Sequence, residues 1–431
     1  MAPHSSTHPR SALPDPSPAL ARRILQRVGE AGQPPEIGIE HLNVGNERVL
    51  DVLDREYLVP IATEGRGSSF KLVQAYFGGG KTHFLYCMRG RAWARGMATA
   101  QVDLSPDECP FDDPHRIYQA VAREIALAPA DVNVPPARGF DQVLLTAFED
   151  RSRELTPAEL DLWVDSSLRR LPIDSPSFKA AVLAWYKAWR EGNSEAEDLA
   201  AAWLRGEDVS AAEVRRLGIR ETISHQNAFR MLRSLCQMMQ GLGVPGILLA
   251  FDEMDRVLSL GAKRRRAIAD NLRQLIDLCG RESLPGLFCL YAVPPEFMRS
   301  VVTEYPALQQ RLEGPAALSE RSPQAAVIDL ETLDLPPEEV LFQIGLRLLH
   351  LYGIANGVTF DIALQQQNLR ALAAEVFATS FEVAHRRAFV KAALDLLGHQ
   401  AAQPGPLSQS DARGLARRGG ELVVLAGGEE F

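Results

Sequence analysis

The sequence predicts an α/β fold in which a mainly parallel sheet forms the middle of three layers. Three largely apolar runs without regular polar alternation, at 70–73, 247–251 and 287–293, are typical of strands buried on both faces of such a sheet. The segments between about 130 and 225 and beyond 331 instead repeat apolar residues at helical spacing. We therefore expect a helical insertion within the sheet domain and a C-terminal helical lid.

These patterns divide the 431-residue chain into four regions. Residues 1–18 are rich in Pro, Ser and His, a composition typical of a disordered leader. We expect the sheet domain, with its insertion, over 19–330 and the helical lid over 331–398. Residues 399–431 hold Gln, Pro, Gly and Ser with little periodicity, which predicts a flexible tail.

The composition is that of a globular protein, with 46% hydrophobic and 23% charged residues. The formal net charge of −9 gives no overall basic footprint for nucleic acid, so any contact with DNA is expected to be local. The five cysteines are scattered without metal-ligand spacing and read as reduced thiols. Because no signal peptide and no membrane-spanning run is visible, we expect a cytoplasmic protein that does not contact a membrane.

A glycine-rich turn stands between the first apolar run and a helical segment. Glycines 78–80 are followed by Lys81 and Thr82, and such a strand-turn-helix directs several backbone N–H groups at one point, where a polyphosphate binds. The lysine would reach the β- and γ-phosphates, and the threonine hydroxyl would hold Mg²⁺. Ala75 stands where the usual pattern begins with glycine. The residues expected to bind the nucleotide here are Gly78, Gly79, Gly80, Lys81, Thr82 and His83. The alternative is a glycine-rich turn that happens to precede a lysine.

An acidic pair follows the second buried strand. Ligands of parallel sheets bind at the carboxyl ends of the strands, where Asp252 and Glu253 are expected to lie. Asp252, with Thr82, would hold Mg²⁺, and Glu253 would orient or deprotonate the attacking water, as phosphoryl transfer to water requires. With Lys81 on the phosphates, the sequence predicts a site for ATP and Mg²⁺.

Two arginines and one earlier turn are further candidates. Arg311 ends a helix at the place where ring-forming ATPases carry an arginine finger, although a surface ion pair with Glu313 explains it equally well. Arg387 begins the final lid helix, where an arginine commonly reaches back to the nucleotide. Val44 and Gly45 would lie against the adenine, or would form only the turn that opens a helix.

Other features have simpler explanations. The four cations 263–266 could contact DNA phosphate but are more typical of a solvated helix face. Tryptophans and a tyrosine in the insertion fit the core of a small helical bundle better than a surface for stacking bases. Pro294 stands after the third buried strand, where a polar residue normally senses the γ-phosphate.

The chain resembles the ATP-binding proteins of bacterial BREX phage-exclusion systems, the BrxC/BrxD-like P-loop family, and is closest to its shorter D-type members. More distantly it is similar to the ORC/Cdc6-like branch of the AAA+ ATPases, whose cores are three-layer P-loop (ASCE-type) sheets. The residues that carry the resemblance are 76–85, 102–105, 202–207 with 217–219, 246–253, 291–297 and 386–389.

The resemblance implies an ATP-hydrolysing switch or motor subunit in defence against foreign DNA, working beside a helicase or other defence proteins. DNA binding and homo-oligomerisation are further expectations from it. A nucleotide-dependent assembly platform, or DNA-loader adaptor, with little hydrolysis is the main alternative, because Pro294 departs from the family pattern. A small-molecule kinase fits less well, since it leaves the insertion and the lid arginines without a function.

Overall fold

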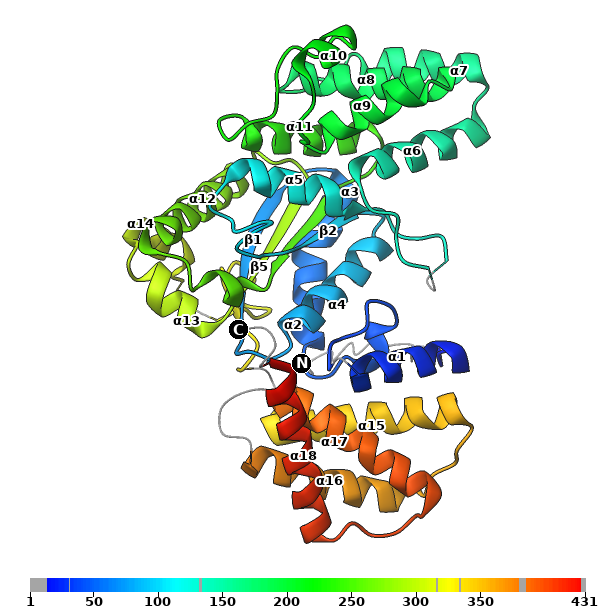
Figure 1. Ribbon diagram of the computed structural model, residues 1–431, viewed down its shortest axis with the longest axis vertical. Helices are drawn as coiled ribbons and strands as arrows, with labels where there is room; N and C mark the ends of the chain where they lie inside the picture. Colours follow the sequence, from blue (N-terminus) through cyan, green and yellow to red (C-terminus); the bar gives the residue numbers. More distant parts are fainter. Residues whose placement is uncertain are drawn as a thin grey trace, which may run out of the picture. The chain divides into compact units, whose positions relative to one another are not determined.

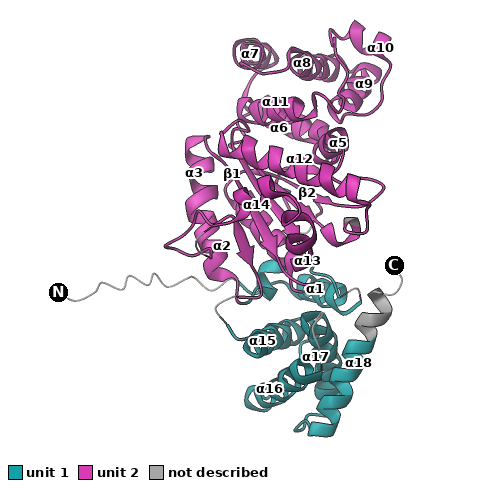
Figure 2. Ribbon diagram, turned by 90° about the vertical axis from the view of Figure 1, so that its left-hand side faces the viewer, with its two compact units in different colours: residues 1–44, 335–431 teal, residues 45–334 magenta. Residues whose placement is uncertain are grey.

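The computed structural model divides the chain into two compact units, which Figure 2 shows in different colours. The sheet unit comprises residues 45–334, and the helical unit comprises residues 1–44 together with 335–431. The structure describes residues 14–30, 32–131, 134–314, 317–332, 335–379 and 385–427. Among these residues, no helix combines the length and the apolar character that a membrane crossing requires.

A six-stranded sheet forms the centre of the sheet unit, in the order β3-β2-β4-β5-β1-β6. All neighbouring strands are parallel except β3, which pairs with β2 in the antiparallel sense. The strands are β1 (Ser68–Gln74), β2 (Ala98–Asp103), β3 (Ile125–Ala126), β4 (Ile247–Asp252), β5 (Leu287–Val293) and β6 (Val327–Asp329). This sheet confirms the predicted α/β fold class.

Burial on both faces explains the apolar runs of the sequence. Every residue of β4 and β5 is buried, because helices cover the sheet on both sides (Figure 1). Right-handed crossovers place α4, which connects β1 to β2, on the opposite face from α12, which connects β4 to β5. The helical segments around the sheet are α2 (Glu47–Leu53), η2 (Asp54–Leu58), α3 (Val59–Glu64), α4 (Lys81–Ala94), α5 (Pro114–Glu124), η4 (Met254–Val257), α12 (Ala262–Gly280), α13 (Pro295–Phe297), η5 (Met298–Val302) and α14 (Pro306–Leu312).

A helical insertion lies between β3 and β4, close to where the sequence predicts it. Its members are α6 (Phe140–Glu154), α7 (Pro157–Trp163), η3 (Val164–Leu168), α8 (Pro176–Glu191), α9 (Ser194–Leu204), α10 (Ala211–Arg216) and α11 (Ala228–Gly241). Thr156 opens α7 with a reciprocal capping box to Glu159, and the Ser175 side chain caps α8. The insertion ends with α11, which leads to the amino end of β4. The predicted site lies at the carboxyl ends of the strands, which is the opposite end of the sheet.

The aromatic residues of the insertion form its core. Trp185 and Trp203 are 2% and 1% exposed, and Phe148 lies against the rings of Trp185 and Trp189 at 6.0 and 6.1 Å between centroids. Burial of this kind leaves these large side chains no open face for a nucleic-acid base. The structure therefore agrees with the core explanation of these residues.

The helical unit combines the beginning and the end of the chain. It contains α1 (Pro18–Glu30), η1 (Ile39–Leu42), α15 (Pro337–Asn356), α16 (Ile362–Thr379), α17 (His385–Ala402) and α18 (Gln409–Gly427). The amphipathic α1 buries Ala21 and Ile24 in the core of this unit, so residues 19–44 group with the C-terminal helices and not with the sheet.

The flexible tail predicted over 399–431 is replaced by structure as far as residue 427. The Asn368 side chain donates to the Gly405 carbonyl and accepts from the Leu407 backbone N–H, which fixes the turn before α18. Leu415 and Ala416 of that helix are buried in the same core. The local sequence carries no signal for this turn, because the side chain that fixes it lies far away along the chain.

Candidate nucleotide-binding site

The phosphate loop of the sequence adopts the strand-turn-helix geometry that anion binding requires. β1 ends at Gln74, and α4 begins at Lys81. Gly78 and Gly80 have φ angles of 72° and 93°, in the left-handed region that glycine enters without steric cost. His83 lies in the first turn of α4. The N-terminus of α4 and the loop before it therefore offer backbone donors for an anion.

Ala75 replaces the usual first glycine without backbone strain. It is fully buried, and its N–H donates to the Val293 carbonyl of β5 at 3.2 Å. The described non-glycine residues with positive φ are Phe111, Glu253 and Glu282, so Ala75 keeps an ordinary conformation. The departure from the motif is therefore compatible with the shape of the loop.

Glu331 supports the phosphate loop from the segment after β6. Its Oε1 accepts a hydrogen bond from the Tyr76 N–H at 3.2 Å. The same oxygen would lie 2.5 Å from a Cβ added at Gly79. This contact explains why the middle residue of the loop is glycine, although its φ is not positive. Glu331 is a site residue that the sequence analysis missed, since only the fold brings β6 beside β1.

Lys81 is folded back onto its own loop. Its Nζ donates to the carbonyls of Ala75 and Tyr76 at 3.1 and 3.3 Å and forms an ion pair with Asp255 Oδ2 at 3.4 Å. Only 7% of the lysine is exposed. These are long contacts around a cation that a phosphate would attract more strongly.

Thr82 and Asp252 meet below the loop, as the sequence predicts. The Thr82 hydroxyl donates to Asp252 Oδ2 at 2.5 Å, and Asp252 Oδ1 accepts from the Glu253 N–H at 2.8 Å. Asp252 is 2% exposed, and this burial raises the pKa of its carboxyl against the opposing effects of Thr82 and Lys81. A buried carboxylate beside a hydroxyl provides the oxygen ligands that Mg²⁺ prefers.

Two more acids adjoin Asp252. Glu253 has a φ of 61°, and its Oε2 is 2.8 Å from Nη1 of Arg256. Asp103, at the end of β2, lies directly opposite Asp252 in the strand register. Desolvation and repulsion by Asp252 raise the pKa of Asp103 to about 6. Asp103 is a further acid of the site, and its place at the carboxyl end of a neighbouring strand is the sequence signal that could have found it.

The remaining candidates lie outside this cluster of groups. Arg311 ends α14, and its Nε and Nη2 contact the two oxygens of Asp277 on α12 at 2.5 and 3.0 Å. Its predicted alternative partner, Glu313, accepts instead from Gln309. Pro294 follows β5 with extended backbone dihedrals, so that strand end carries no polar side chain.

Gly45 and Asn46 precede α2 in the sheet unit, whereas Val44 and Arg387 belong to the helical unit. Gly45 has a φ of 81°, which fits the turn that the sequence predicts there. Asn46 is 3% exposed, and its Oδ1 accepts no hydrogen bond from the described residues. A buried acceptor without a donor is costly, so this position suits a ligand that donates one.

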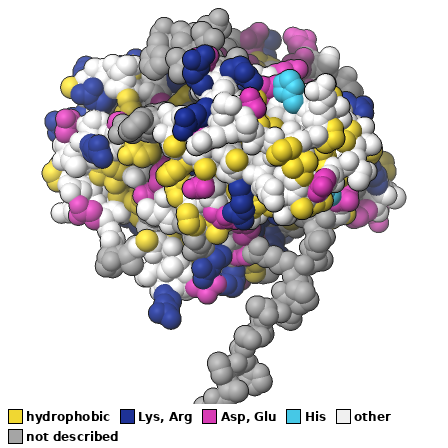
Figure 3. Space-filling view, turned by 90° about the horizontal axis from the view of Figure 1, so that it is seen from below, with side chains coloured by type: hydrophobic (Ala, Val, Ile, Leu, Met, Phe, Trp, Pro, Cys, Tyr) yellow, Lys and Arg dark blue, Asp and Glu magenta, His cyan; other side chains and the backbone are white. Residues whose placement is uncertain are grey.

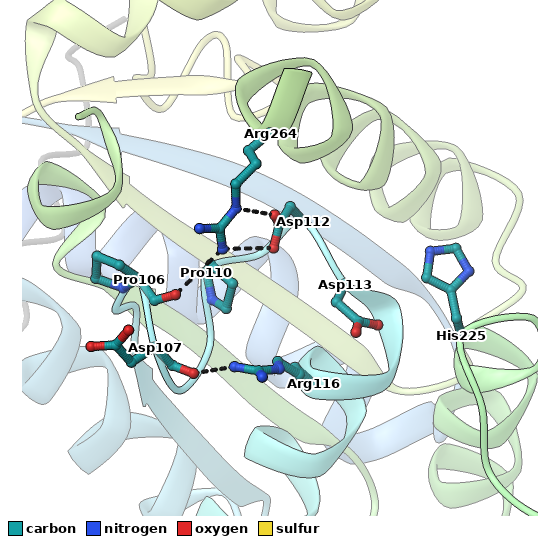
Figure 4. A pocket seen from close by; sticks show the side chains of 8 residues that line it. All are labelled: Pro106, Asp107, Pro110, Asp112, Asp113, Arg116, His225 and Arg264. Atoms are coloured by element: carbon teal, nitrogen blue, oxygen red, sulfur yellow. Dashed lines mark hydrogen bonds and ion pairs between the residues drawn. The ribbon is translucent and has the colours of Figure 1, made fainter. Parts of the chain in front are cut away.

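Two members of the basic segment 263–266 are used inside the sheet unit. Arg264 contacts both oxygens of Asp112, at 2.5 and 3.4 Å, and the pair lines a pocket of about 490 Å³ (Figure 4). Arg265 donates to the Leu260 carbonyl at 2.9 Å. Because Asp107, Asp112 and Asp113 line the same pocket, it offers a poor surface for DNA phosphate.

Charged residues are also mixed elsewhere. On the face shown in Figure 3, Lys and Arg side chains are interspersed with Asp and Glu, in keeping with the net charge of −9.

Comparison with known proteins identifies the family. The family model described as "BREX system ATP-binding protein BrxC/D" matches residues 17–406. The chain belongs to this family. No curated protein matches this chain. A solved structure, that of the Aeropyrum pernix ORC2 protein in ADPNP–ADP complexes, is 12% identical and has a TM-score of 0.42. The match covers 86% of this chain and 67% of the ORC2 chain.

Family membership and geometry agree on the phosphate loop. The description of the BrxC/D family names ATP binding, and in this member the loop at 75–82 lies above the buried Asp252. Both belong to the span that the family model matches.

Proposed function

We propose that this protein binds ATP with Mg²⁺ at the phosphate loop and hydrolyses it, as an AAA+-like switch or motor subunit of a BREX-type defence system. The contact between Thr82 and Asp252, beneath a loop that carries Lys81, is the observation that supports this proposal most directly. It joins a hydroxyl, a carboxylate and a cation at one helix N-terminus, which is the set that a metal-bound triphosphate requires.

Each residue has a defined part in the proposed reaction. The N–H groups of Gly78 and Gly80 and the Lys81 ammonium bind the phosphates, with the N–H groups of Thr82 and His83 completing the helix N-terminus. The Gly79 N–H donates to the Tyr76 carbonyl at 2.9 Å and joins them only by leaving that carbonyl. Thr82 and Asp252 would hold Mg²⁺, which would supply positive charge beside the phosphate oxygens. Glu253 accepts a proton from the attacking water, whose oxygen bonds to the γ-phosphorus as the bond to ADP breaks.

The residues proposed to contact the adenine and to report the state of the nucleotide are chosen from their places in the sequence. The Asn46 Oδ1, which accepts no hydrogen bond from the described residues, supports a place for the adenine beside Gly45, because the amino group of adenine can donate to it. Arg387 is proposed to contact the nucleotide from the helical unit and so to report the loss of the γ-phosphate.

Arg311 is proposed to act on the nucleotide of a neighbouring copy. For that role it must leave Asp277, with which it forms a bidentate but partly exposed ion pair. Changing Arg311 to Ala should then reduce turnover by about 10³-fold or more while ATP affinity is retained. The exposed Arg299 on η5 provides a matched control. Equal turnover of the two variants would remove Arg311 from the mechanism.

A nucleotide-dependent platform with little hydrolysis is the second candidate. The pairing of Glu253 with Arg256 and the absence of a polar side chain at Pro294 favour it. In both cases the proposed partners are other defence proteins, such as a helicase. The complex is proposed to bind DNA and to work in the cytoplasm.

Two variants test the proposal. Lys81→Ala should abolish ATP binding, since it removes the cation that contacts the phosphates. Glu253→Gln should keep ATP bound and reduce phosphate release by about 10²- to 10⁴-fold. Binding and release are measured with and without DNA, and the exposed Lys187→Ala serves as a control. Equal loss of binding in both variants contradicts the roles. If the wild type releases no phosphate under any of these conditions, the nucleotide-dependent platform is the function that remains.

A further inference from the structure

One short turn contacts both charged groups of the proposed hydrolytic site. The turn η4 (Met254–Val257) directly follows β4 and Glu253. Its Asp255 forms the ion pair with Lys81, and its Arg256 forms the ion pair with Glu253. The cation expected on the phosphates and the carboxylate expected on the water are therefore both held by consecutive residues of one element.

The contact of Asp255 with Lys81 opposes nucleotide binding. These contacts occupy all three N–H donors of the ammonium, so a phosphate oxygen gains a hydrogen bond only if the lysine gives up at least one of them, and Asp255 is the most distant of the three acceptors. Asp255 is itself incompletely satisfied, because its Oδ1 is buried and accepts no hydrogen bond from the described residues. Such a contact is poised to break when a more highly charged anion competes for the cation.

The contact of Arg256 with Glu253 opposes the chemical step. The guanidinium occupies Oε2 of the carboxylate, one of the two oxygens that a base uses to accept a proton. Glu253 also has φ and ψ angles of 61° and 31°, a left-handed conformation that is unfavourable for a side chain with a Cβ. Strained backbones of this kind are held by surrounding contacts and occur at switch segments.

We propose that Asp255 and Arg256 are positioning residues that restrain Lys81 and Glu253 until ATP binds. The γ-phosphate draws Lys81 away from Asp255, which frees the turn to move and so releases Glu253 from Arg256. This inference rests on the proposed ATPase function. It assigns the regulation of that site to η4, a turn in which the sequence analysis placed no functional residue.

The restraint is tested by separating ATP affinity from turnover. Asp255→Asn removes the competitor for Lys81 and should lower the Kd for a slowly hydrolysed ATP analogue about five- to tenfold. Arg256→Gln should raise kcat by a similar factor and leave the Kd unchanged, whereas Arg256→Lys, which keeps the charge, should return kcat toward that of the wild type. Asp208→Asn and Arg299→Gln change exposed residues of the same types and serve as controls.

The outcomes distinguish this inference from the proposed function. If the wild type binds the analogue but Asp255→Asn binds it equally or more weakly, the restraint on Lys81 is wrong. If the wild type hydrolyses ATP measurably and the kcat of Arg256→Gln is equal or lower, the restraint on Glu253 is wrong. If Arg256→Gln hydrolyses ATP and the wild type does not, the restraint on Glu253 is supported. Failure of the wild type to bind any nucleotide would instead refute the proposed function itself.

Discussion

The Thr82 hydroxyl donates to Asp252 Oδ2 at 2.5 Å, although the two residues are 170 positions apart in the chain. Thr82 lies in the first turn of α4, and Asp252 is the last residue of β4, which β5 separates from β1. The whole insertion is contained in the intervening sequence. The fold thus joins the phosphate loop to the acidic strand end through one direct contact.

Removal of this hydroxyl should weaken the metal site. Thr82→Ala takes away one of the two proposed protein ligands of Mg²⁺ and leaves the buried Asp252 Oδ2 without this donor, whereas Oδ1 keeps the Glu253 N–H. We expect phosphate release to fall about 10- to 100-fold and to need a higher Mg²⁺ concentration. A Mg²⁺ titration of the phosphate-release rate measures both effects.

Thr63→Ala is the matched control for this experiment. Thr63 also donates its hydroxyl, but to the Val59 carbonyl on an exposed helix face. Its Mg²⁺ dependence should equal that of the wild type. An identical Mg²⁺ dependence in Thr82→Ala would exclude Thr82 as a metal ligand.

Gly79 should not tolerate even one added methyl group. A Cβ there would lie 2.5 Å from Glu331 Oε1 and 2.9 Å from both the Ala75 Cβ and the Tyr76 carbonyl oxygen. The loop must shift to relieve these contacts, so Gly79→Ala should weaken ATP binding about tenfold or more, as measured by calorimetry.

Gly90→Ala is the control for Gly79→Ala, because it shows whether ATP affinity falls when any glycine near the loop is replaced. Gly90 lies in the middle of α4, and its added Cβ meets no atom within 4 Å. Alanine should therefore increase the free energy of unfolding by about 0.5–1 kcal/mol without changing ATP affinity. Similar ATP affinities of the two variants would show that the shape of the loop is unimportant.

Much of the sheet could be predicted because burial on both faces leaves continuous apolar runs in the sequence. Ile247–Asp252 and Leu287–Val293 are strands at the predicted places. Lys71 shows where this reasoning stops. It lies within a buried strand, and only the fold supplies the carbonyls of Pro323 and Ala325 that accept its hydrogen bonds.

The motif residues of the site could also be predicted, but their supporting residues could not. Thr82 and Asp252 belong to short patterns with a known chemical purpose. Glu331 and Asp255 occur in loops whose local sequence carries no signal, and their contacts with Tyr76 and Lys81 depend on strand order. Tertiary contacts of this kind are not encoded at a fixed spacing.

Lys71 predicts a pH dependence of stability. It is 1% exposed, and burial lowers the pKa of its ammonium from 10.5 to about 8. Between these values the unfolded chain binds a proton that the folded protein has lost, so the contribution of Lys71 to the free energy of unfolding rises with pH. The rise should reach at most about 1.4 kcal/mol per pH unit.

Urea unfolding between pH 7 and 10 measures this dependence. Lys71→Met should lose this contribution, so its free energy of unfolding should decline relative to that of the wild type as the pH rises, whereas the exposed Lys187→Met should stay parallel to the wild type. The difference between each variant and the wild type isolates Lys71 from the buried cysteines and tyrosines, whose raised pKa values give the opposite slope in the same range. Parallel curves for Lys71→Met and the wild type would contradict the prediction.

The aromatic core of the insertion should dominate its stability. Trp185 is 2% exposed and stacks on Trp189 at 6.4 Å between ring centroids. Trp185→Ala should cost about 3–5 kcal/mol of unfolding free energy, because the surrounding core cannot fill the cavity. On the same helix, the exposed Lys187→Ala should change it by less than about 0.5 kcal/mol. Chemical denaturation compares the two, and equal losses would show that the ring is not a core residue.

Calorimetric titration of the full-length protein with ATP, in the presence and absence of Mg²⁺, tests the central claim most directly. We predict saturable binding that Mg²⁺ strengthens in the wild type, and loss of that binding in Lys81→Ala. Absence of heat with the wild type at millimolar ATP and Mg²⁺, or equal binding by Lys81→Ala, would contradict the assignment of the site.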